Sequence, residues 1–542
     1  MITPQPAGFL CLVLHAHLPF IRHPEKQYTM EENWLYEAIT ETYIPLLTYF
    51  NNLIDDEIPF KITMSLTPTL CSMLDNELLQ NRYAAHIGRL IELAEKEVRR
   101  TRYDRAMNRA AWMYLDRFSL CKHVFEDVYG RDIVPGFKRL QDAGVLEIVT
   151  CAATHGYLPN MRSNAVAVRA QIEVAVQSYQ NFFDRPPRGI WLPECGYYQG
   201  LETILSQYGI RYTFLETHGI LNANPVPPAG IYAPVRCGEA HVAAFARDAE
   251  SGKSVWSADE GYPGDPHYRE FHKDIGFDLG LNYIAPYIDP AGIRINTGVK
   301  YHRVTDKRNP EKQLYDRETA LSRAAAHASD FISKRTEQIK NIARATDSPP
   351  VVTAPYDAEL FGHWWFEGPE WLNFLIRKCA LEQNVFRLTT PSEYLDNYPE
   401  THICAPAFSS WGDGGYSHVW LNETNEWIYP HLHRMEDCMV QCAHGLKDTE
   451  RGGLKERTLN QMARELLLAQ SSDWAFIMKT GTTVEYATRR VKEHIASFWK
   501  LYETVTTGDG DEGFVGLLEG HNNIFGGIDF RVYKDTQGPR RT

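Results

Sequence analysis

The 542-residue chain lacks the cysteine patterns of disulfide frameworks and small zinc-binding modules. Its 10 cysteines are scattered singly, and no two of them form a C-x-x-C pair. Cys438 and Cys442, one helical turn apart, come nearest to a pair. In a chain of this length such a pattern indicates reduced, buried thiols and predicts a cytoplasmic protein rather than a secreted scaffold.

Long apolar runs and an excess of positive charge are also missing. No apolar run reaches the roughly 18–20 residues that a membrane span requires. The first run, residues 8–14, has no basic residue before it and no small-residue cleavage site after it, so we expect a buried strand rather than a signal peptide. The net charge of −13 argues against nucleic acid and anionic membranes as partners.

Short apolar runs alternate with helical stretches over most of the chain, which predicts an α/β sheet or barrel. The clearest helix of this part is predicted over residues 165–183, where apolar side chains recur every three to four positions. The predicted strands are residues 10–14, 60–66, 146–150, 189–192, 212–215, 350–354 and 385–389.

The length predicts two or three domains. We expect a catalytic barrel over residues 1–400, with an all-helical insertion near residues 75–130 that lacks proline. Residues 221–241 are predicted to form a lid-like loop, since their first part is rich in proline. After about residue 400 the pattern changes to helices only, which predicts a C-terminal helical domain over residues 401–542.

Ionisable side chains follow four of the predicted strands. His15 and His17 follow the first, His155 follows the run 146–150, Glu194 follows the run 189–192, and Asp357 follows the run 350–354. In a parallel barrel the carboxyl ends of all strands open on one face, and catalytic residues come from several of them. Each histidine alone is more often a satisfied core residue, and Glu194 alone is as often a solvated turn residue. Only their coincidence therefore indicates an active site.

Two carboxylates at such strand ends could cleave a glycosidic bond. Glu194 would attack the anomeric carbon, while Asp357 would protonate the leaving oxygen and then activate the acceptor. Burial beside Trp364 and Trp365, together with the charge of ionised Glu194, would raise the pKa of Asp357. Glu359 is the alternative candidate for the general acid.

Five motifs carry a family resemblance. They are HAHLPF at residues 15–20, ATHGYLP at 153–159, WLPEC at 191–195, APYDAELFGHWW at 354–365 and SSDW at 471–474. In combination they resemble glycoside hydrolase family 57, and most closely its 1,4-α-glucan branching enzymes, over nearly the whole chain.

The resemblance implies a distorted (β/α)7 barrel and a retaining mechanism that needs no metal or other cofactor. It implies Glu194 as nucleophile, Asp357 as acid/base and an α-1,4-glucan as substrate. It also implies that Asp473 and Trp474 reach into the cleft from the C-terminal domain. His15, His17 and His155 would then hydrogen-bond sugar hydroxyls near the nucleophile.

Looser matches add further substrate-binding candidates. Arg247 could hydrogen-bond a sugar, and Trp364 lies in the acid/base motif. Trp411 and Trp420 resemble tryptophans that line the glucan cleft in branching enzymes, with core packing as the alternative for both. The remaining candidates are Trp34, evenly balanced between cleft and core, and Tyr232, the single tyrosine of the 221–241 loop and the candidate gating residue.

The predicted reaction is branching, in which the 6-hydroxyl of another glucan chain attacks the glucosyl-enzyme. An α-glucan hydrolase or a 4-α-glucanotransferase on the same scaffold is the first alternative, because only the acceptor differs. A metal-dependent carbohydrate enzyme is the second, since His-x-His at a strand end can bind zinc. A non-catalytic glucan-binding protein is the third, and the two carboxylates disfavour it. Nothing in the sequence indicates an oligomeric state.

Overall fold

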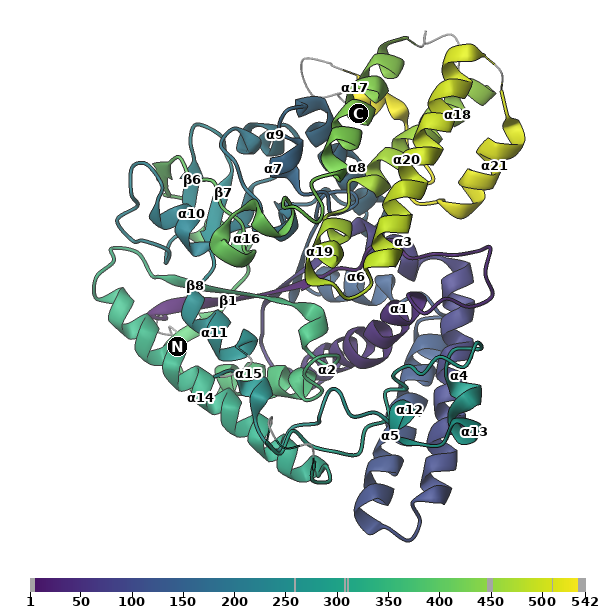
Figure 1. Ribbon diagram of the computed structural model, residues 1–542. Coiled ribbons are helices and arrows are strands. Elements are labelled where there is room, and N and C mark those ends of the chain that lie inside the picture. The colour runs from purple at the N-terminus through teal and green to yellow at the C-terminus, as the bar shows by residue number, and fades with distance from the viewer. Residues whose placement is uncertain are drawn as a thin grey trace.

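The structure is a computed structural model that describes residues 5–257, 260–306, 309, 311–445, 452–508 and 510–534. Its strands lie at the centre, with helices packed around them, and the C-terminal helices form a group of their own beside the strands (Figure 1). Among the described residues, none of the helices combines the length and the apolar surface that crossing a bilayer requires.

The strands form two sheets with the orders β3-β2-β1-β8 and β10-β6-β7-β5-β4, and β9 pairs with β1 beside the first. Two parallel bridges join the sheets, one between Thr150 and Ile190 and one between Arg247 and Thr353. Through these bridges β1, β2, β3, β4, β5, β7 and β8 close into a ring of parallel neighbours. The prediction of an α/β barrel is therefore confirmed. The barrel is distorted because at two places a single bridge, rather than a full strand pairing, joins neighbouring strands.

The strand bounds are β1 (Gly8–Ala16), β2 (Ile62–Leu66), β3 (Leu146–Val149), β4 (Gly189–Ile190), β5 (Tyr212–Leu215), β6 (Val235–Cys237), β7 (Ala243–Ala246), β8 (Val351–Asp357), β9 (Phe386–Leu388) and β10 (His402–Cys404).

Alternation along β1 determines what faces the inside of the barrel. Cys11 and Val13 belong to an interior cluster that also holds Trp191 and Phe214 from other strand regions. Leu10, Leu12 and Leu14 pack instead with the surrounding helices. Because side chains two residues apart share a face of a strand, His15 continues the inward series at the end of the strand.

Three strands were not predicted from the sequence, and a fourth, which was predicted, lies outside the ring. β7 supplies the seventh strand of the ring, whereas the predicted strand at 385–389 is β9, which pairs with β1 outside the ring. β6 lies inside the predicted 221–241 loop and runs antiparallel to β7. β10 pairs with β6, so the prediction of helices only after residue 400 is wrong for residues 402–404. A backbone strand at this edge satisfies hydrogen-bonding groups of β6 that would otherwise lack a partner.

Helices cover the barrel, and two long ones lie within residues 75–130. α8 (Ala165–Phe183) has the predicted bounds, and the side chain of Asn164 caps it by accepting from the amides of Val166 and Ala167. The insertion consists of α4 (Glu77–Arg100) and α5 (Arg105–His123), which pack along each other and project from the barrel (Figure 1).

The other helices of this part are α1 (Glu32–Ala38), α2 (Ile44–Asp55), α3 (Pro68–Leu74), α6 (Val134–Asp142), α7 (Leu158–Met161), α9 (Leu201–Gln207), α10 (Thr217–Leu221), α11 (Ala249–Trp256), α12 (Ile275–Asp278), α13 (Leu281–Ile284), α14 (Arg317–Ala343), α15 (Gly368–Leu381) and α16 (Pro391–Asn397). The C-terminal group comprises α17 (Ile428–Gly445), α18 (Leu454–Ala469), α19 (Ser472–Thr480), α20 (Val484–Thr507) and α21 (Glu512–His521).

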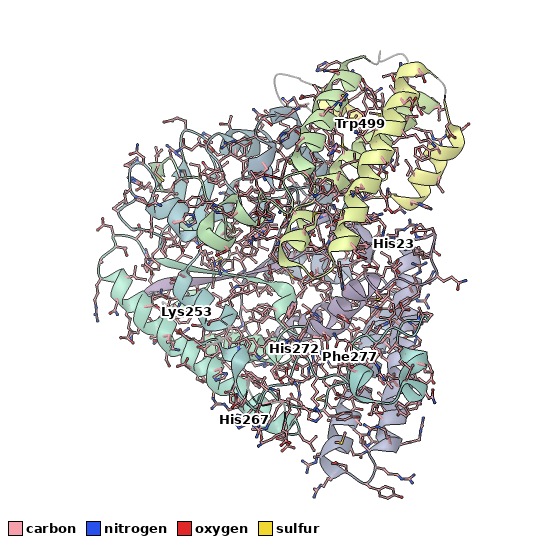
Figure 2. All side chains as sticks on the ribbon, in the orientation of Figure 1. His23, Lys253, His267, His272, Phe277 and Trp499 are labelled. Carbon is pink, nitrogen blue, oxygen red and sulfur yellow. The ribbon has the colours of Figure 1, made fainter. Side chains whose placement is uncertain are left out.

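Buried polar contacts fasten the C-terminal helices to the barrel. Gln171 of α8 donates to Gln470 at 2.9 Å, and Gln470 donates to Glu436 of α17 at 2.9 Å. His23, labelled in Figure 2, lies 2.9 Å from the hydroxyl of Tyr486 on α20. Since unpaired buried polar groups are costly, these contacts fix how the helices sit on the barrel.

Candidate functional site

A cavity of about 970 Å³ lies where the carboxyl ends of the barrel strands meet the C-terminal helices. Such a volume fits a small-molecule or oligosaccharide site. Ten of the predicted site residues line it: His15, His17, His155, Glu194, Arg247, Asp357, Trp364, Trp411, Trp420 and Asp473.

Three predicted site residues lie elsewhere. Trp34 meets Tyr486 edge-on, with ring centroids 6.1 Å apart, and is outside the cavity wall. Trp474 is buried, and its indole N–H donates to the carbonyl of Leu468 at 2.8 Å. Neither residue lines the cavity in this structure.

Tyr232 is also outside the cavity wall, as is every other residue of the 221–241 segment. The carbonyl of Tyr232 accepts from the amide of Val351, the first residue of β8, at 2.8 Å. Asp357 is the last residue of that strand, about 20 Å away at about 3.3 Å per residue. The structure thus does not bring the candidate gating residue to the site.

Glu194 occupies a strained turn that begins three residues after the end of β4. The turn Pro193–Cys195 is a single 3₁₀ turn in which Glu194 has φ 62° and Cys195 has φ 51°. Left-handed backbone at two successive non-glycine residues is unfavourable, and such strain clusters at functional sites. The carbonyl of Glu194 accepts from the amide of Trp411 at 2.9 Å, which helps to hold the turn.

Two hydrogen-bond donors contact the carboxylate of Glu194. The indole N–H of Trp411 donates to Oε2 at 2.8 Å, and the hydroxyl of Ser472 donates to Oε1 at 2.9 Å. Burial raises the pKa of Glu194, whereas these two hydrogen bonds act against the rise. Each carboxylate oxygen thus has one donor, which fixes the orientation of the group toward the cavity.

A chain of hydrogen bonds leads from the barrel interior to Glu194. A carboxylate only accepts, so Ser472 donates to Glu194 and must accept from Nδ1 of His155 at 2.8 Å. Nε2 of His155 then accepts from Nε2 of His15 at 3.0 Å. Burial lowers the pKa of both histidines, and two neutral rings suit this order of donors.

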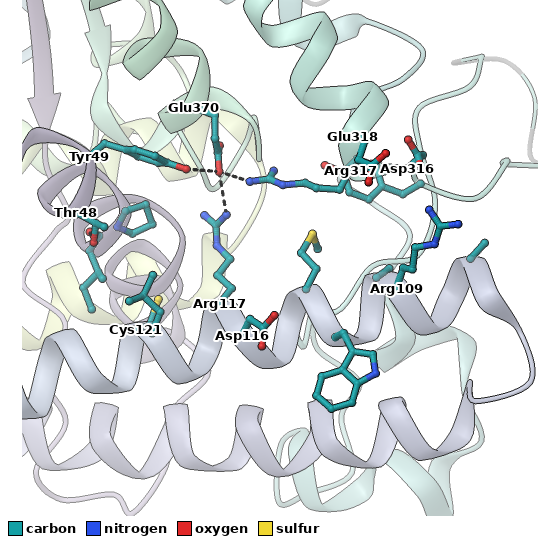
Figure 3. A pocket seen from close by; sticks show the side chains of 18 of the residues that line it. Thr48, Tyr49, Arg109, Asp116, Arg117, Cys121, Asp316, Arg317, Glu318 and Glu370 are labelled. Atoms are coloured by element: carbon teal, nitrogen blue, oxygen red, sulfur yellow. Dashed lines mark hydrogen bonds and ion pairs between the residues drawn. The ribbon is translucent and has the colours of Figure 1, made fainter. Parts of the chain in front are cut away.

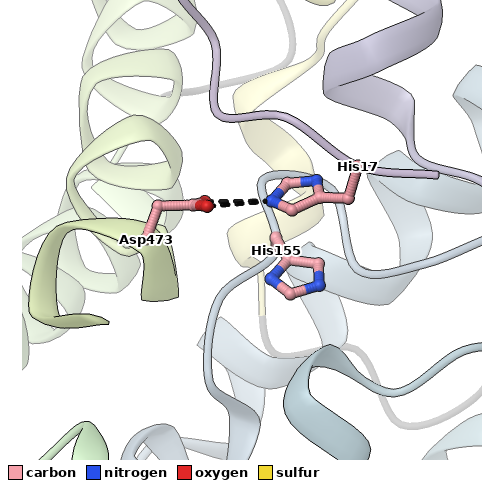
Figure 4. A group of neighbouring side chains, drawn as sticks. All are labelled: His17, His155 and Asp473. Atoms are coloured by element: carbon pink, nitrogen blue, oxygen red, sulfur yellow. Dashed lines mark hydrogen bonds and ion pairs between the residues drawn. The ribbon is translucent and has the colours of Figure 1, made fainter. Parts of the chain in front are cut away.

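His17 and Asp473 form a second, charged pair. Nε2 of His17 lies 3.0 Å from Oδ2 of Asp473 (Figure 4). Despite burial, the charge of Asp473 raises the pKa of His17, and His17 in turn lowers the pKa of Asp473 to about 2. The pair joins the end of β1 to the first turn of α19.

His17, His155 and Asp473 have ligand atoms within 4.8 Å of one another, close enough for a metal ion (Figure 4). The two imidazole rings, however, are stacked with centroids 3.8 Å apart and an interplanar angle of 13°. Ring lone pairs lie in the ring plane, so stacked rings cannot aim them at one ion. Both nitrogens of His155 also have partners already, so the geometry fits a hydrogen-bonding cluster better than a tetrahedral metal site.

Asp357 ends β8 beside His15, its register partner on β1. Burial, followed by the charges of Glu359 and Glu194, raises its pKa well above the ordinary range. Asp357 therefore holds a proton under conditions in which an exposed aspartate is ionised. A proton donor and an ionisable acceptor-only carboxylate thus line the same cavity.

Glu359 is fixed by a neighbouring helix rather than left free. It accepts from the hydroxyl of Tyr43 and from the amide of His17 at 3.2 Å. Tyr43 belongs to a π-helical turn, η1 (Ile39–Tyr43), between α1 and α2. Such turns are rare in proteins, and those that occur are often found at functional sites. At Gly362, with φ 115°, a Cβ would lie 1.8 Å from the carbonyl oxygen of Glu41, so only glycine permits this contact with the π turn.

Exposed aromatic side chains at the cavity wall include two that the sequence analysis missed. Trp364 is 56% exposed and stacks on Phe271 with centroids 4.5 Å apart. Trp256, at the end of α11, and Phe476, on α19, are 36% and 46% exposed and also line the cavity. A single aromatic on a helix carries no sequence signal of its own. The one signal that could have identified Phe476 is its position as an aromatic residue on the polar face of an amphipathic helix.

The chain matches two family descriptions. Residues 11–406 match Glycosyl hydrolase family 57, and residues 431–533 match the 1,4-alpha-glucan branching enzyme C-terminal domain. A curated relative, a 1,4-alpha-glucan branching enzyme of Thermococcus kodakarensis, is 35% identical over 96% of this chain and 77% of its own length.

Two solved structures that resemble this chain carry two different named activities. The alpha-amylase AmyC from Thermotoga maritima is 46% identical, with a TM-score of 0.91 over 98% of this chain and 99% of its own. The branching enzyme of Thermococcus kodakaraensis, solved in complex with glucose and additives, is 34% identical, with a TM-score of 0.87 over 98% of both chains. The fold, the cavity and the sequence matches agree: this chain belongs to glycoside hydrolase family 57, whose members act on α-glucans, and carries a C-terminal domain of the branching-enzyme type.

Proposed function

We propose that the protein is a retaining 1,4-α-glucan branching enzyme with Glu194 as nucleophile and Asp357 as acid/base. One observation carries the proposal: a carboxylate held by two hydrogen-bond donors and a buried aspartic acid with a raised pKa line a single cavity. These are the two protonation states that a double displacement at an anomeric carbon requires.

In the first step, Glu194 forms a bond to the anomeric carbon while the bond from that carbon to the leaving oxygen breaks. Asp357 gives its proton to that oxygen. In the second step, Asp357 takes a proton from the 6-hydroxyl of an acceptor chain, whose oxygen displaces Glu194 and restores the original configuration. The ionised Asp357 is then protonated again, as at the start.

The cavity wall supports a glucan as the ligand. Trp364, Phe476 and Trp256 are large apolar side chains left open to solvent, and exposed apolar surface in a cleft marks a binding site. The C–H faces of glucose units suit such rings. The branching-type C-terminal domain and the branching enzymes among the relatives support transfer as the outcome.

Hydrolysis is the second candidate, because the 46% identical AmyC is named an alpha-amylase. Incubation with amylose distinguishes the two, since hydrolysis creates reducing ends and branching creates α-1,6 linkages without a net gain of reducing ends. We expect α-1,6 linkages, counted by NMR and by debranching, to exceed new reducing ends. Reducing ends without α-1,6 linkages would contradict branching while leaving the retaining chemistry intact.

Ser472→Ala is expected to slow the reaction and to change its pH dependence. The hydroxyl of Ser472 holds the nucleophile in its orientation toward the cavity, so its loss should lower kcat/KM on amylose by about 10- to 100-fold. The lost donor opposed the rise in the pKa of Glu194. That pKa therefore rises further, and the acidic limb of the kcat/KM profile moves to higher pH.

Ser471→Ala is the matched control, because the hydroxyl of Ser471 donates to Asp473 at 2.5 Å rather than to Glu194. Its acidic limb should stay at the wild-type position. An unshifted limb in Ser472→Ala would show that this hydroxyl does not stabilise the charge of Glu194.

Glu359→Gln is expected to shift the opposite limb. The charge of Glu359 is, after burial, the largest contribution to the raised pKa of Asp357. Glutamine keeps an acceptor for Tyr43 and removes that charge, so the pKa of Asp357 falls. An acid that must be protonated then loses its proton at lower pH, and the alkaline limb of kcat/KM moves down. A limb that stays in place, with the variant still folded throughout the pH range, would exclude this coupling.

A further inference from the structure

A second cavity, of about 890 Å³, lies between α5 of the helical insertion, α2 and the start of α14 (Figure 3). It shares no lining residue with the catalytic cavity. Neither this cavity nor the helical insertion beside it takes part in the proposed reaction.

The back wall of this cavity is a buried polar cluster around Glu370. Oε1 of Glu370 accepts from the hydroxyl of Tyr49 at 3.0 Å and from Arg317, and it lies 3.7 Å from Arg117 (Figure 3). Among the residues that the structure describes, Oε2 of Glu370 and Nη1 of Arg317 have no hydrogen-bond partner. Both atoms are buried, so they lie behind the cavity surface, and the cluster fixes this wall rather than offering free groups to a ligand.

One face of α5 forms the opposite wall. Arg105, Arg109, Trp112 and Asp116 follow one another at three- and four-residue spacing, so they share that face. Trp112 is 49% exposed, although tryptophan side chains are on average largely buried. The wall therefore offers an exposed indole ring beside polar side chains and beside further apolar ones such as Met113 and Leu120.

The charges around the cavity balance. The cationic side chains are Arg105, Arg109, Arg117 and Arg317, and the anionic ones are Asp116, Asp316, Glu318 and Glu370. A site for a phosphate or a carboxylate would carry an excess of arginine. A balanced set of donors and acceptors beside an open indole instead complements a neutral ligand that is rich in hydroxyls.

We propose that this cavity binds a segment of an α-1,4-glucan chain outside the catalytic cavity, a proposal that rests on the proposed function. The indole of Trp112 stacks on the apolar face of a glucose unit, and the guanidinium and carboxylate groups bond its hydroxyls. A polymeric substrate reaches both cavities at once, so binding here raises its effective concentration at the active site. A short oligosaccharide gains nothing from the second contact.

The test compares Trp112→Ala with two variants of the same hairpin. Trp112→Tyr keeps an aromatic ring, and Tyr103→Ala removes an aromatic that is 88% exposed but lies outside the cavity wall. Affinity electrophoresis in gels with glycogen measures binding, and kinetics on amylose and on maltoheptaose measure its effect. We expect Trp112→Ala to lose about 3- to 10-fold in glycogen affinity and to raise KM for amylose similarly. The kcat/KM for maltoheptaose should stay at the wild-type value.

Trp112→Tyr should restore most of the affinity, and Tyr103→Ala should behave as wild type. Glycogen retardation of Trp112→Ala equal to that of wild type would overturn the proposal, as would an equal loss in Tyr103→Ala. Because electrophoresis needs no turnover, these results are separate from the catalytic proposal. A wild-type protein that leaves amylose unchanged would contradict the proposed function instead.

Discussion

Replacing Glu194 with alanine is expected to lower the rate on amylose by roughly 10⁴- to 10⁶-fold, as loss of a covalent nucleophile does in other enzymes. No other described carboxylate at the cavity wall has the same pair of donors, one from Trp411 and one from Ser472. Asp473 is committed to His17, and Glu359 to Tyr43. A neighbour therefore cannot take over the attack.

Azide distinguishes loss of the nucleophile from general damage. With an α-glucosyl fluoride as donor, azide fills the space left by Glu194, forms a C–N bond at the anomeric carbon and expels fluoride. One displacement inverts the configuration, so the product should be the β-glucosyl azide. Glu202→Gln is the control, because Glu202 accepts from the hydroxyl of Tyr197 at 2.8 Å and lies outside the cavity wall. Wild-type turnover by Glu194→Ala, or an α-azide from it, would contradict the assignment.

The strand ends of the barrel could be predicted from sequence because each apolar run is local. β1 and β8 are mostly apolar, as strands buried on both faces require, and the polar groups stand at or beside their ends, with His15 and His17 around Ala16 and Asp357 as the last residue of β8. β7 was missed because Ala243-Ala244-Phe245-Ala246 has no β-branched residue and no alternation. It holds its place through pairing with β5 and the bridge from Arg247 to Thr353, which are properties of the closed ring.

The environment of the site was less predictable than its carboxylates. The donors to Glu194 come from residues 217 and 278 positions away in the chain, and no local pattern encodes such contacts. Ser472 looks like a helix-terminus residue by sequence, and it does stand in the first turn of α19. Its contact with Glu194 arises because the segment after α18 docks on the loop that holds His155.

Replacing Asp357 with alanine should have an effect that depends on the leaving group. A glucan oxygen needs a proton to depart, so turnover of amylose should fall by roughly 10²- to 10⁴-fold, the contribution of general acid catalysis. Fluoride departs without a proton. The first displacement on an α-glucosyl fluoride should therefore stay within about tenfold of wild type, measured as a burst of fluoride release.

The α-glucosyl fluoride also distinguishes Asp357 from Glu359 as the general acid, because only loss of the general acid has an effect that depends on the leaving group. The glucosyl-enzyme of Asp357→Ala still forms on Glu194, and azide attacks it in a second inversion, so the product should be the α-glucosyl azide. Glu359→Ala, assayed at a pH below the alkaline limb, where Asp357 keeps its proton, should instead lose similar fractions of its rate on amylose and on the fluoride, because there it acts only through its contacts with Tyr43 and His17. If Glu359→Ala alone were rescued by the better leaving group, the acid would be Glu359, and Asp357 would be the residue that positions it.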